Sequence, residues 1–387
     1  MQLIFFVDNR GWAFDHIAQN LCVILKGFNP RIVYTEDFRN TFDFIGYLEK
    51  NVTKETHLHF FWRGYLFDSL KFLIYLGKAG GCALGKINQC VVTTHIPDCL
   101  YSTHEELRSG YGRVLDYVNG YFVTSEKLLN HYRDVWPGKK PYGKIYDVAL
   151  VGKKGPVKEK ARAPKLKAVW IGNSKWGEHL GYKDYKGFHS VILPVFERLR
   201  NSGENVELTV YDKSIKAASH QEIIGSLENS DLLVIASEEE GTPLPLVEAM
   251  SNGCAVVTTD VGIVSEVLPD VQKPFVLKRS SDDFYKAVMA LAKDNDLLLS
   301  CKNANVEAYN NIWGDGKEIK EQWAGFIQKS SSNNNVSQKN DVVASIASTS
   351  WVKKKLFILA LMLSGSRIKE YAKKFRFLSY LFFSFKS

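Results

Sequence analysis

Two glutamates in the second half of the chain, Glu240 and Glu248, have types and a spacing that suit ligand binding. Glu240 lies in a turn rich in glycine and proline that follows an apolar run, and Glu248 lies inside a helical pattern opened by Pro245. Both can face the crevice at the carboxyl ends of parallel strands, where doubly wound sheets bind ligands. The free N–H groups of a helix start suit a phosphate, and a carboxylate one turn further can accept hydrogen bonds from ribose hydroxyls. The spacing alone is equally consistent with an ordinary helix that acids near its N-terminus stabilise.

The elements that must position these residues are short apolar strands that alternate with helical stretches such as 188–200 and 244–252. Continuous apolar strands separated by helices indicate parallel sheets covered on both faces. Two such series indicate two doubly wound domains. The predicted strands are Leu3–Val7, Arg31–Tyr34, His57–Trp62, Val91–Thr94, Tyr121–Thr124, Lys167–Ile171, Glu207–Tyr211, Leu232–Ala236, Ala255–Thr259 and Phe275–Leu277.

Polar stretches divide the chain into four parts. The stretch Gly152–Pro164 is rich in Gly, Pro and Lys, so we expect a first domain over 1–160 and a second over 161–329. The Ser/Asn-rich segment 330–350 is typical of a disordered linker, because such a composition has little apolar surface to bury. A basic, amphipathic tail then occupies 351–387.

The formal net charge of +8 is concentrated in that tail. It contains nine of the 50 basic side chains and one of the 42 acidic ones, so the preceding 350 residues carry 41 of each. A neutral body with a basic tail is not typical of a nucleic-acid-binding protein. The six cysteines form no CxxC pair, which argues against a zinc site or a disulfide framework and favours a reducing compartment.

The start of the sequence, MQLIFFVDNRG, lacks the basic residues and the apolar core of roughly 7–15 residues that a signal peptide needs. No run of about 18 uncharged apolar residues predicts a membrane-spanning helix. We therefore expect the chain to stay in the cytoplasm.

The stretch 237–266, SEEEGTPLPLVEAMSNGCAVVTTDVGIVSE, resembles the donor-binding signature of retaining glycosyltransferases of the GT4 family. That signature is E-x7-E within an EGxPxxxxEAMxxG run, followed by a strand and a glycine turn. The chain follows the family's order of motifs from about residue 3 to about residue 327. The resemblance implies an α/β, GT-B fold, with two doubly wound Rossmann-like domains facing a central cleft, and an enzyme of the bacterial surface-polysaccharide type. The matching residues are Glu240, Gly241, Pro243, Pro245, Glu248, Ala249, Met250, Gly253, Gly262 and Glu266.

The resemblance also implies a pair of cations for the donor diphosphate. The segment WIGNSKWGEHLGYKDYKGF is similar to a strand and loop where the family has an Arg or Lys and then a Lys-Gly. Lys186, before Gly187, fits the second position. Lys175 is our choice for the first, with Lys183 as the competitor. Each lysine would act as a compact point charge.

Further matches lie in the first domain. In VVTTHIPD, His95 resembles the family's histidine in the crevice, which touches the transferred sugar. In VDNRGWAFDHIA, Gly11 corresponds to the turn where the family lets the backbone approach the substrates, with Trp12 and His16 as neighbours in that cleft. Trp12 is equally consistent with ordinary core. The stretch KIYDVALVG departs from the family's PNGVD-like end of the first domain.

The implied reaction moves a sugar from a nucleotide-diphosphate donor to a hydroxyl and keeps the anomeric configuration. Charge builds on the leaving diphosphate, so fixed cations and N–H donors are required. Lys175, Lys186 and the backbone N–H groups of Thr242 and Leu244 are the expected donors. Glu248 would hold the ribose and Glu240 the sugar, with His95 orienting it from the opposite domain. No DxD pair follows a strand, so we expect neither a metal nor another cofactor.

The tail suggests where the enzyme acts. Residues at helical spacing, Ile368, Tyr371, Ala372, Phe375, Leu378 and Phe382, form an apolar stripe beside lysines. This pattern is typical of a helix that lies in an anionic membrane surface, where each basic residue contributes about 1 kcal/mol. We therefore expect a peripheral enzyme at the inner face of the membrane whose acceptor is a glycan on polyprenyl diphosphate, in O-antigen, capsule or exopolysaccharide synthesis. Alternatively, the tail packs on the body or on a partner protein.

Two other functions remain open. A non-hydrolysing sugar-nucleotide epimerase shares the GT-B fold. A catalytically silent GT-B subunit would use its tail to scaffold a partner. The donor base, the sugar, the linkage and the oligomeric state are not legible from the sequence.

Overall fold

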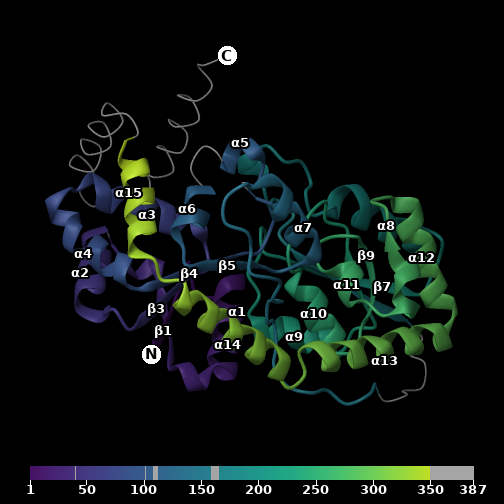
Figure 1. Ribbon diagram of the computed structural model, residues 1–387. Helices are drawn as coiled ribbons and strands as arrows, with labels where there is room; N and C mark the ends of the chain where they lie inside the picture. Colours follow the sequence, from purple (N-terminus) through teal and green to yellow (C-terminus); the bar gives the residue numbers. More distant parts are fainter. Residues whose placement is uncertain (40, 101, 108–111, 158–164, 349–387) are drawn as a thin grey trace.

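The computed structural model describes residues 1–39, 41–100, 102–107, 112–157 and 165–348. It contains two five-stranded sheets, each with helices packed on both faces (Figure 1). We call the part around the first sheet the first lobe and the part around the second sheet the second lobe. All paired strands are parallel, as the continuous apolar strands predict.

The first lobe has the strand order β2-β1-β3-β4-β5. The central strand, β1, is buried on both faces, with Leu3, Phe5 and Val7 in one apolar core and Ile4 and Phe6 in another. The strands are β1 (Gln2–Val7), β2 (Pro30–Tyr34), β3 (Thr56–Phe60), β4 (Val91–Ile96) and β5 (Gly120–Val123). The helices are α1 (Ala13–Ile24), α2 (Thr41–Asn51), α3 (Arg63–Tyr75), α4 (Lys78–Gln89), α5 (His104–Glu106), α6 (Gly112–Tyr117) and α7 (Glu126–Val135).

The second lobe has the strand order β10-β9-β8-β6-β7. Its strands are β6 (Leu166–Gly172), β7 (Val206–Asp212), β8 (Leu232–Ile235), β9 (Ala255–Thr259) and β10 (Val276–Leu277). Its helices are α8 (Leu193–Asn201), α9 (His220–Glu228), α10 (Leu244–Ser251), α11 (Val264–Val267), α12 (Ser281–Lys293) and α13 (Asn295–Ile312). The ten strands coincide with the predicted apolar runs to within one or two residues, and the predicted α/β fold with two doubly wound sheets is confirmed.

The chain returns to the first lobe after α13. Helix α14 (Lys317–Ser332) packs on the first sheet, where the Trp323 ring lies 5.8 Å from that of Phe5 and 5.1 Å from that of Phe122. The outgoing and returning segments are bonded to each other, because the Gly152 N–H donates to the Gly314 carbonyl over 2.9 Å. The stretch expected as the end of the second domain therefore belongs, from residue 317 onward, to the first lobe.

The described part of the expected linker 330–350, residues 330–348, is not disordered as its composition predicts. Within it, helix α15 (Val336–Ala347) lies beside α3 and α6 of the first lobe (Figure 1). Lys339 is 1% exposed, and its ammonium donates to the carbonyls of Cys90 (2.5 Å) and Asn88 (3.3 Å). Val342, Val343 and Ile346 pack against the same lobe. Tertiary contacts thus order a helix that its polar composition alone would not predict.

The predicted tail, 351–387, lies outside the described residues. Among the residues that are described, no helix is both long enough and apolar enough to cross a bilayer.

Candidate functional site

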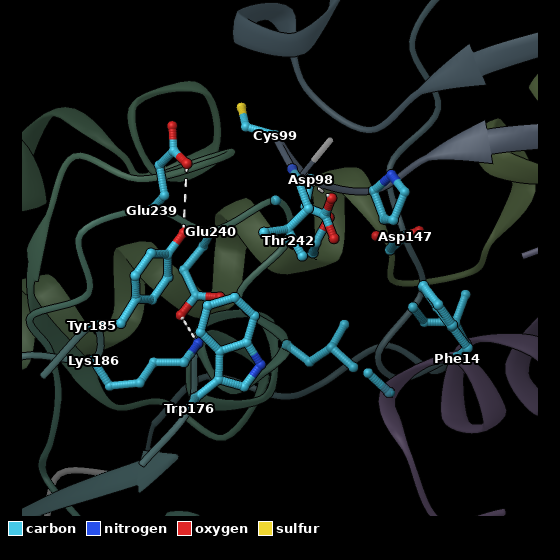
Figure 2. Close-up of a pocket in the computed structure, with 16 residues that line it drawn as sticks. Phe14, Asp98, Cys99, Asp147, Trp176, Tyr185, Lys186, Glu239, Glu240 and Thr242 are labelled. Carbon is cyan, nitrogen blue, oxygen red and sulfur yellow. Dashed lines mark hydrogen bonds and ion pairs between the residues drawn. The ribbon is translucent and has the colours of Figure 1, made fainter. Parts of the chain in front are cut away.

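A cavity of about 230 Å³ lies between the lobes, at the carboxyl ends of strands from both sheets (Figure 2). The second lobe contributes the turn after β8 and the loop after β6. The first lobe contributes the turn after β4 and the start of α1. Doubly wound sheets bind ligands at this edge because helix N-termini and loop N–H groups converge there. The lining residues are Ala13, Phe14, Ile17, Pro97, Asp98, Cys99, Leu100, Asp147, Trp176, Tyr185, Lys186, Glu239, Glu240, Gly241, Thr242 and Leu244.

The cation of the cavity is paired with the first glutamate of the signature. The Lys186 ammonium donates a short hydrogen bond to Oε1 of Glu240, and both side chains are 18% exposed. The Ser237 hydroxyl donates to the same oxygen over 2.7 Å, which fixes the carboxylate. Gly187 has φ +66°, and a Cβ there would lie 2.2 Å from the Ala236 carbonyl oxygen. A glycine therefore lets the Lys186 loop lie directly against the end of β8.

The turn between β8 and α10 touches the opposite lobe. A Cβ on Gly241 would lie 1.3 Å from the carbonyl oxygen of Pro97, so only a glycine allows this approach of two backbones. Thr242 and Leu244, the expected N–H donors, line the cavity beside Gly241. Helix α10 begins at Leu244 with proline in its first turn, as the sequence predicts.

Glu248 is not among the residues that line this cavity. It lies one turn into α10, is 4% exposed, and its Oε1 lies 2.8 Å from Nε2 of His220 at the start of α9. The hydrogen bond that His220 donates to the Glu248 carboxylate raises the pKa of His220. The His220 ring lies 4.3 Å from that of His16 on α1, so this contact also joins the two lobes. Sequence reasoning missed His220, although Ser219 and Glu222 form a capping box that marks its helix start.

His95 does not line the cavity, contrary to expectation. Strand β4 continues through Ile96, so His95 lies inside the sheet, 1% exposed, against Phe61 and Phe122. Burial lowers the pKa of His95 to about 3. The next residues along the chain, Pro97, Asp98 and Cys99, line the cavity in its place.

Three other expected positions also lie away from the cavity lining. Lys175 and its competitor Lys183 are exposed on the loop after β6, where Trp176 and Lys186 line the cavity instead. Gly11 forms the turn after β1 with φ +69°, and its N–H donates to Oδ2 of Asp15 over 2.7 Å. Helix α1 reaches the cavity through Ala13, Phe14 and Ile17. Of the residues that line the cavity, the sequence analysis therefore identified Lys186, Glu240, Gly241, Thr242 and Leu244.

The cavity contains acidic side chains that sequence reasoning missed. Asp98 and Asp147 come from the first lobe and Glu239 from the second (Figure 2). Burial raises the pKa of Asp98, and it raises the pKa of Asp147 from 3.8 to about 7. The stretches HIPD and KIYD hold these two acids directly after strand-like runs, which was the available signal. Only Lys186 opposes these carboxyl groups among the described lining residues, so a protonated acid here limits the repulsion of an anionic ligand.

Comparisons with known proteins bear on the family and the fold of this chain. Residues 160–308 match the family described as glycosyl transferases group 1. A search of curated proteins gives no match.

Solved structures similar to this chain include Anabaena HepE in complex with UDP, with a TM-score of 0.55 over 85% of this chain and 100% of that one. Sucrose-phosphate synthase from Thermosynechococcus elongatus gives 0.58 over 86% and 100%, and a glycosyltransferase from Rickettsia africae gives 0.56 over 85% and 98%. Each is 12% identical to this chain, so the likeness is one of fold, the GT-B fold.

Proposed function

We propose that this chain, whose residues 160–308 match the glycosyl transferases group 1 family and whose fold is GT-B, moves a sugar, with retention of configuration, from a nucleotide-diphosphate donor to a hydroxyl of a lipid-linked glycan. The supporting observation is the joint placement of Lys186, Glu240 and Gly241 at the start of α10, in the cavity between the lobes. This position offers a cation, N–H groups and a carboxylate to a ligand that combines phosphate with sugar.

Each group has a proposed role in donor binding. Lys186 and the N–H groups of Thr242 and Leu244 bind the diphosphate, which draws Lys186 away from Glu240. Glu240 is then free to accept hydrogen bonds from the sugar. Glu248, held by His220 over 2.8 Å, binds the ribose hydroxyls.

These roles fit the charge that develops in the reaction. As the bond to the leaving phosphate breaks, positive charge grows on the anomeric carbon and negative charge grows on the diphosphate. Lys186 and the helix start stabilise that negative charge more in the transition state than in the ground state, which lowers the barrier. The acceptor's proton passes to the leaving phosphate oxygen on the same face. We expect no divalent cation in this step, so EDTA should leave the rate unchanged.

The ligand complexes of one structural neighbour suggest the donor base to test first. HepE of Anabaena has been solved with UDP and with UDP-glucose. We therefore propose a UDP-sugar as donor, with GDP- and dTDP-sugars as the alternatives.

The charge of the tail supports a membrane-bound acceptor. Nine basic side chains in 351–387 would each contribute about 1 kcal/mol near an anionic surface, which is enough to hold the enzyme at the inner leaflet. Helix α15, which is packed on the first lobe, ends at Ala347, shortly before this segment in the sequence. An acceptor on polyprenyl diphosphate, at the stage of surface-polysaccharide assembly, fits such a location.

A thermal-shift panel followed by a transfer assay tests the proposal. UDP-, GDP- and dTDP-sugars are compared at equal concentration, because a ligand that binds only the folded state raises the unfolding temperature. The donor that binds is then incubated with membrane lipids carrying polyprenyl-diphosphate glycans, and the products are identified by mass spectrometry. A retained anomeric configuration in a lipid-linked product supports the proposal.

The same assay separates the alternatives. An epimerase converts the nucleotide sugar without any acceptor. A silent subunit binds nucleotide without hydrolysis or transfer and copurifies with another transferase. Either outcome would replace the proposed function.

A further inference from the structure

A row of buried polar side chains crosses the first sheet and ends at the cavity. His57 and His59 lie on β3, and Thr93 and His95 lie on the adjacent strand, β4; each of the four is at most 1% exposed. Nε2 of His57 lies 2.7 Å from Oγ1 of Thr93, and Nδ1 of His59 lies 3.0 Å from the same oxygen. Nε2 of His59 then lies 3.1 Å from Nδ1 of His95. The proposed function uses none of the atoms in this row.

The direction of the hydrogen bonds depends on where Thr93 places its single proton. In the direction in which its hydroxyl donates to the Leu58 carbonyl, 3.4 Å away, both neighbouring histidines donate to Oγ1. Nε2 of His59 is then an acceptor, and His95 must donate from Nδ1. Burial holds the pKa values of these histidines far below 6.5, so each carries one ring proton. Nε2 of His95 is therefore left as a bare acceptor.

That acceptor points at Asp147. Oδ1 of Asp147 lies 3.9 Å from Nε2 of His95, and Nε2 has no hydrogen-bond partner among the described residues. The separation is too long for a direct hydrogen bond. The Trp313 indole donates to the Asp147 carbonyl over 2.9 Å and fixes the backbone. In Figure 2, Asp147 lies near Asp98 and Thr242, away from Lys186.

We propose that Asp147 is the group of the first lobe that binds a hydroxyl of the transferred sugar, and that His95 is a positioning residue that acts through it. This inference rests on the proposed function and replaces the direct sugar contact first expected of His95. Asp147 lines the cavity, whereas His95 lies behind it with its acceptor nitrogen turned toward the carboxyl group. A protonated Asp147 can donate a hydrogen bond to a sugar oxygen, while Nε2 of His95, 3.9 Å away, acts on the carboxyl group electrostatically rather than through a direct hydrogen bond.

The charge of the cavity gives this arrangement a dependence on pH. A neutral Asp147 does not repel the donor diphosphate, whereas an ionised one does, so donor binding favours the protonated form. Affinity for the donor should therefore fall as the pH rises through the pKa of Asp147, about 7. The charged or titratable groups that line the cavity with Asp147 are Asp98, Cys99, Tyr185, Lys186, Glu239 and Glu240; His95 lies behind Asp147, and the charge of Arg63 acts on His95 and Asp98.

The variant Asp147→Asn tests the proposal because it keeps the shape and the neutral charge but does not titrate. Calorimetry with UDP and UDP-glucose, and the pH profile of kcat/KM, are measured between pH 5.5 and 8.5 for the full chain. We expect the wild type to lose affinity for UDP-glucose above pH 7 and Asp147→Asn to lose that dependence. Asp147→Ala should bind UDP-glucose about 10- to 100-fold more weakly while its affinity for UDP stays within about twofold at pH 6. Asp134→Asn, on the exposed side of α7, is the matched control.

The histidine is tested by a shift of the pH profile. His95→Gln keeps an acceptor but not an aromatic ring, and we expect the inflection near pH 7 to move while kcat at low pH changes less. Because His95 is buried, circular dichroism and thermal unfolding must show that His95→Gln folds. If this variant does not fold, Asp147→Asn alone tests the proposal. If Asp147→Asn binds UDP-glucose with the affinity and the pH profile of the wild type, this inference alone is overturned. A wild type that binds no nucleotide sugar overturns the proposed function as well.

Discussion

Lys186 and Glu240, 54 residues apart in the sequence, form an ion pair in the cavity between the two lobes. The pair joins the loop after β6 to the turn after β8, the two segments that the signature places around the donor. It also keeps the carboxylate and the ammonium neutralised while no diphosphate is bound.

Replacing Lys186 should remove transfer without unfolding the protein. Lys186→Met loses the cation that stabilises the leaving diphosphate, so we expect kcat/KM to fall by about 10²–10³-fold. Lys165→Met removes a 45% exposed lysine of the same lobe and should leave the rate unchanged. Steady-state kinetics with UDP-glucose measure both. A Lys186→Met enzyme with normal turnover would show that the diphosphate binds elsewhere.

Gly241→Ala should separate the lobes. The added methyl group would lie 1.3 Å from the Pro97 carbonyl oxygen, so the turn or the opposite lobe must move. Because a displacement of about 1 Å in substrate position costs about 10²-fold in rate, we expect activity to fall by at least that factor. Small-angle X-ray scattering should give a larger radius of gyration. Gly225→Ala in α9, where an added Cβ meets nothing within 4 Å, is the control.

Glu266→Ala should destabilise the contact between the lobes. Glu266 accepts hydrogen bonds from the Lys144 ammonium (2.8 Å), the Tyr146 hydroxyl (2.9 Å) and the Glu126 N–H (2.8 Å), all from the first lobe. Removing the acceptor that these three donors share should lower the free energy of unfolding by about 1–3 kcal/mol, since two of the three contacts are partly buried. Urea unfolding measures the change. Asp270→Ala, at a side chain that is 93% exposed, should lie within about 0.5 kcal/mol of the wild type.

Asp147→Asn should stabilise the protein at neutral pH. Burial raises the pKa of Asp147 to about 7, so between pH 3.8 and 7 the folded protein holds a proton that the unfolded chain has lost. The stability due to this group is complete below pH 3.8 and is lost as the pH rises through about 7. The difference between the free energies of unfolding of the variant and the wild type should therefore rise by on the order of 2 kcal/mol from pH 5 to pH 8, in favour of the variant. A constant difference across this range would mean that Asp147 is ionised in the folded protein.

Two truncations should separate the roles of α15 and the tail. A chain that ends at residue 349 keeps α15 and should melt like the full chain but leave the membrane fraction. A chain that ends at residue 332 exposes the apolar surface under α15, so we expect a melting temperature lower by several degrees. Differential scanning fluorimetry and flotation with anionic vesicles measure the two effects. If the chain ending at 349 still floats with the vesicles, the tail is not the anchor.

The parts of the structure that follow from local chemistry could be predicted from the sequence. Apolar runs mark the ten described strands because most of these strands are buried in the sheets, although the edge strand β7 is largely exposed. Lys186, Glu240 and Gly241 could be assigned because the short motifs that contain them resemble the GT4 donor-binding signature. The orientation of His95 could not be predicted, since every residue of β4 is buried and no alternation marks its faces.

Features that depend on contacts between distant segments escaped prediction. Asp147 enters the cavity because the lobes pack together, and nothing in KIYDVALVG reports that packing. Helix α15 has only a sparse apolar stripe, and it is fixed by carbonyls at the end of α4 that lie about 250 residues earlier in the chain. The Ser/Asn content correctly indicates that α15 has little apolar surface and depends on packing against the first lobe.

The paired connections between the lobes limit how the enzyme can open. The outgoing and returning connecting segments are hydrogen-bonded at Gly152 and Gly314. The Asn310 side-chain amide also accepts from the Lys154 N–H and donates to the Lys154 carbonyl, over 2.8 Å in each case. Two tethers held together at one place resist twisting and sliding but permit bending. We therefore expect the two lobes to open for the substrate by rotation about a single hinge axis near these residues.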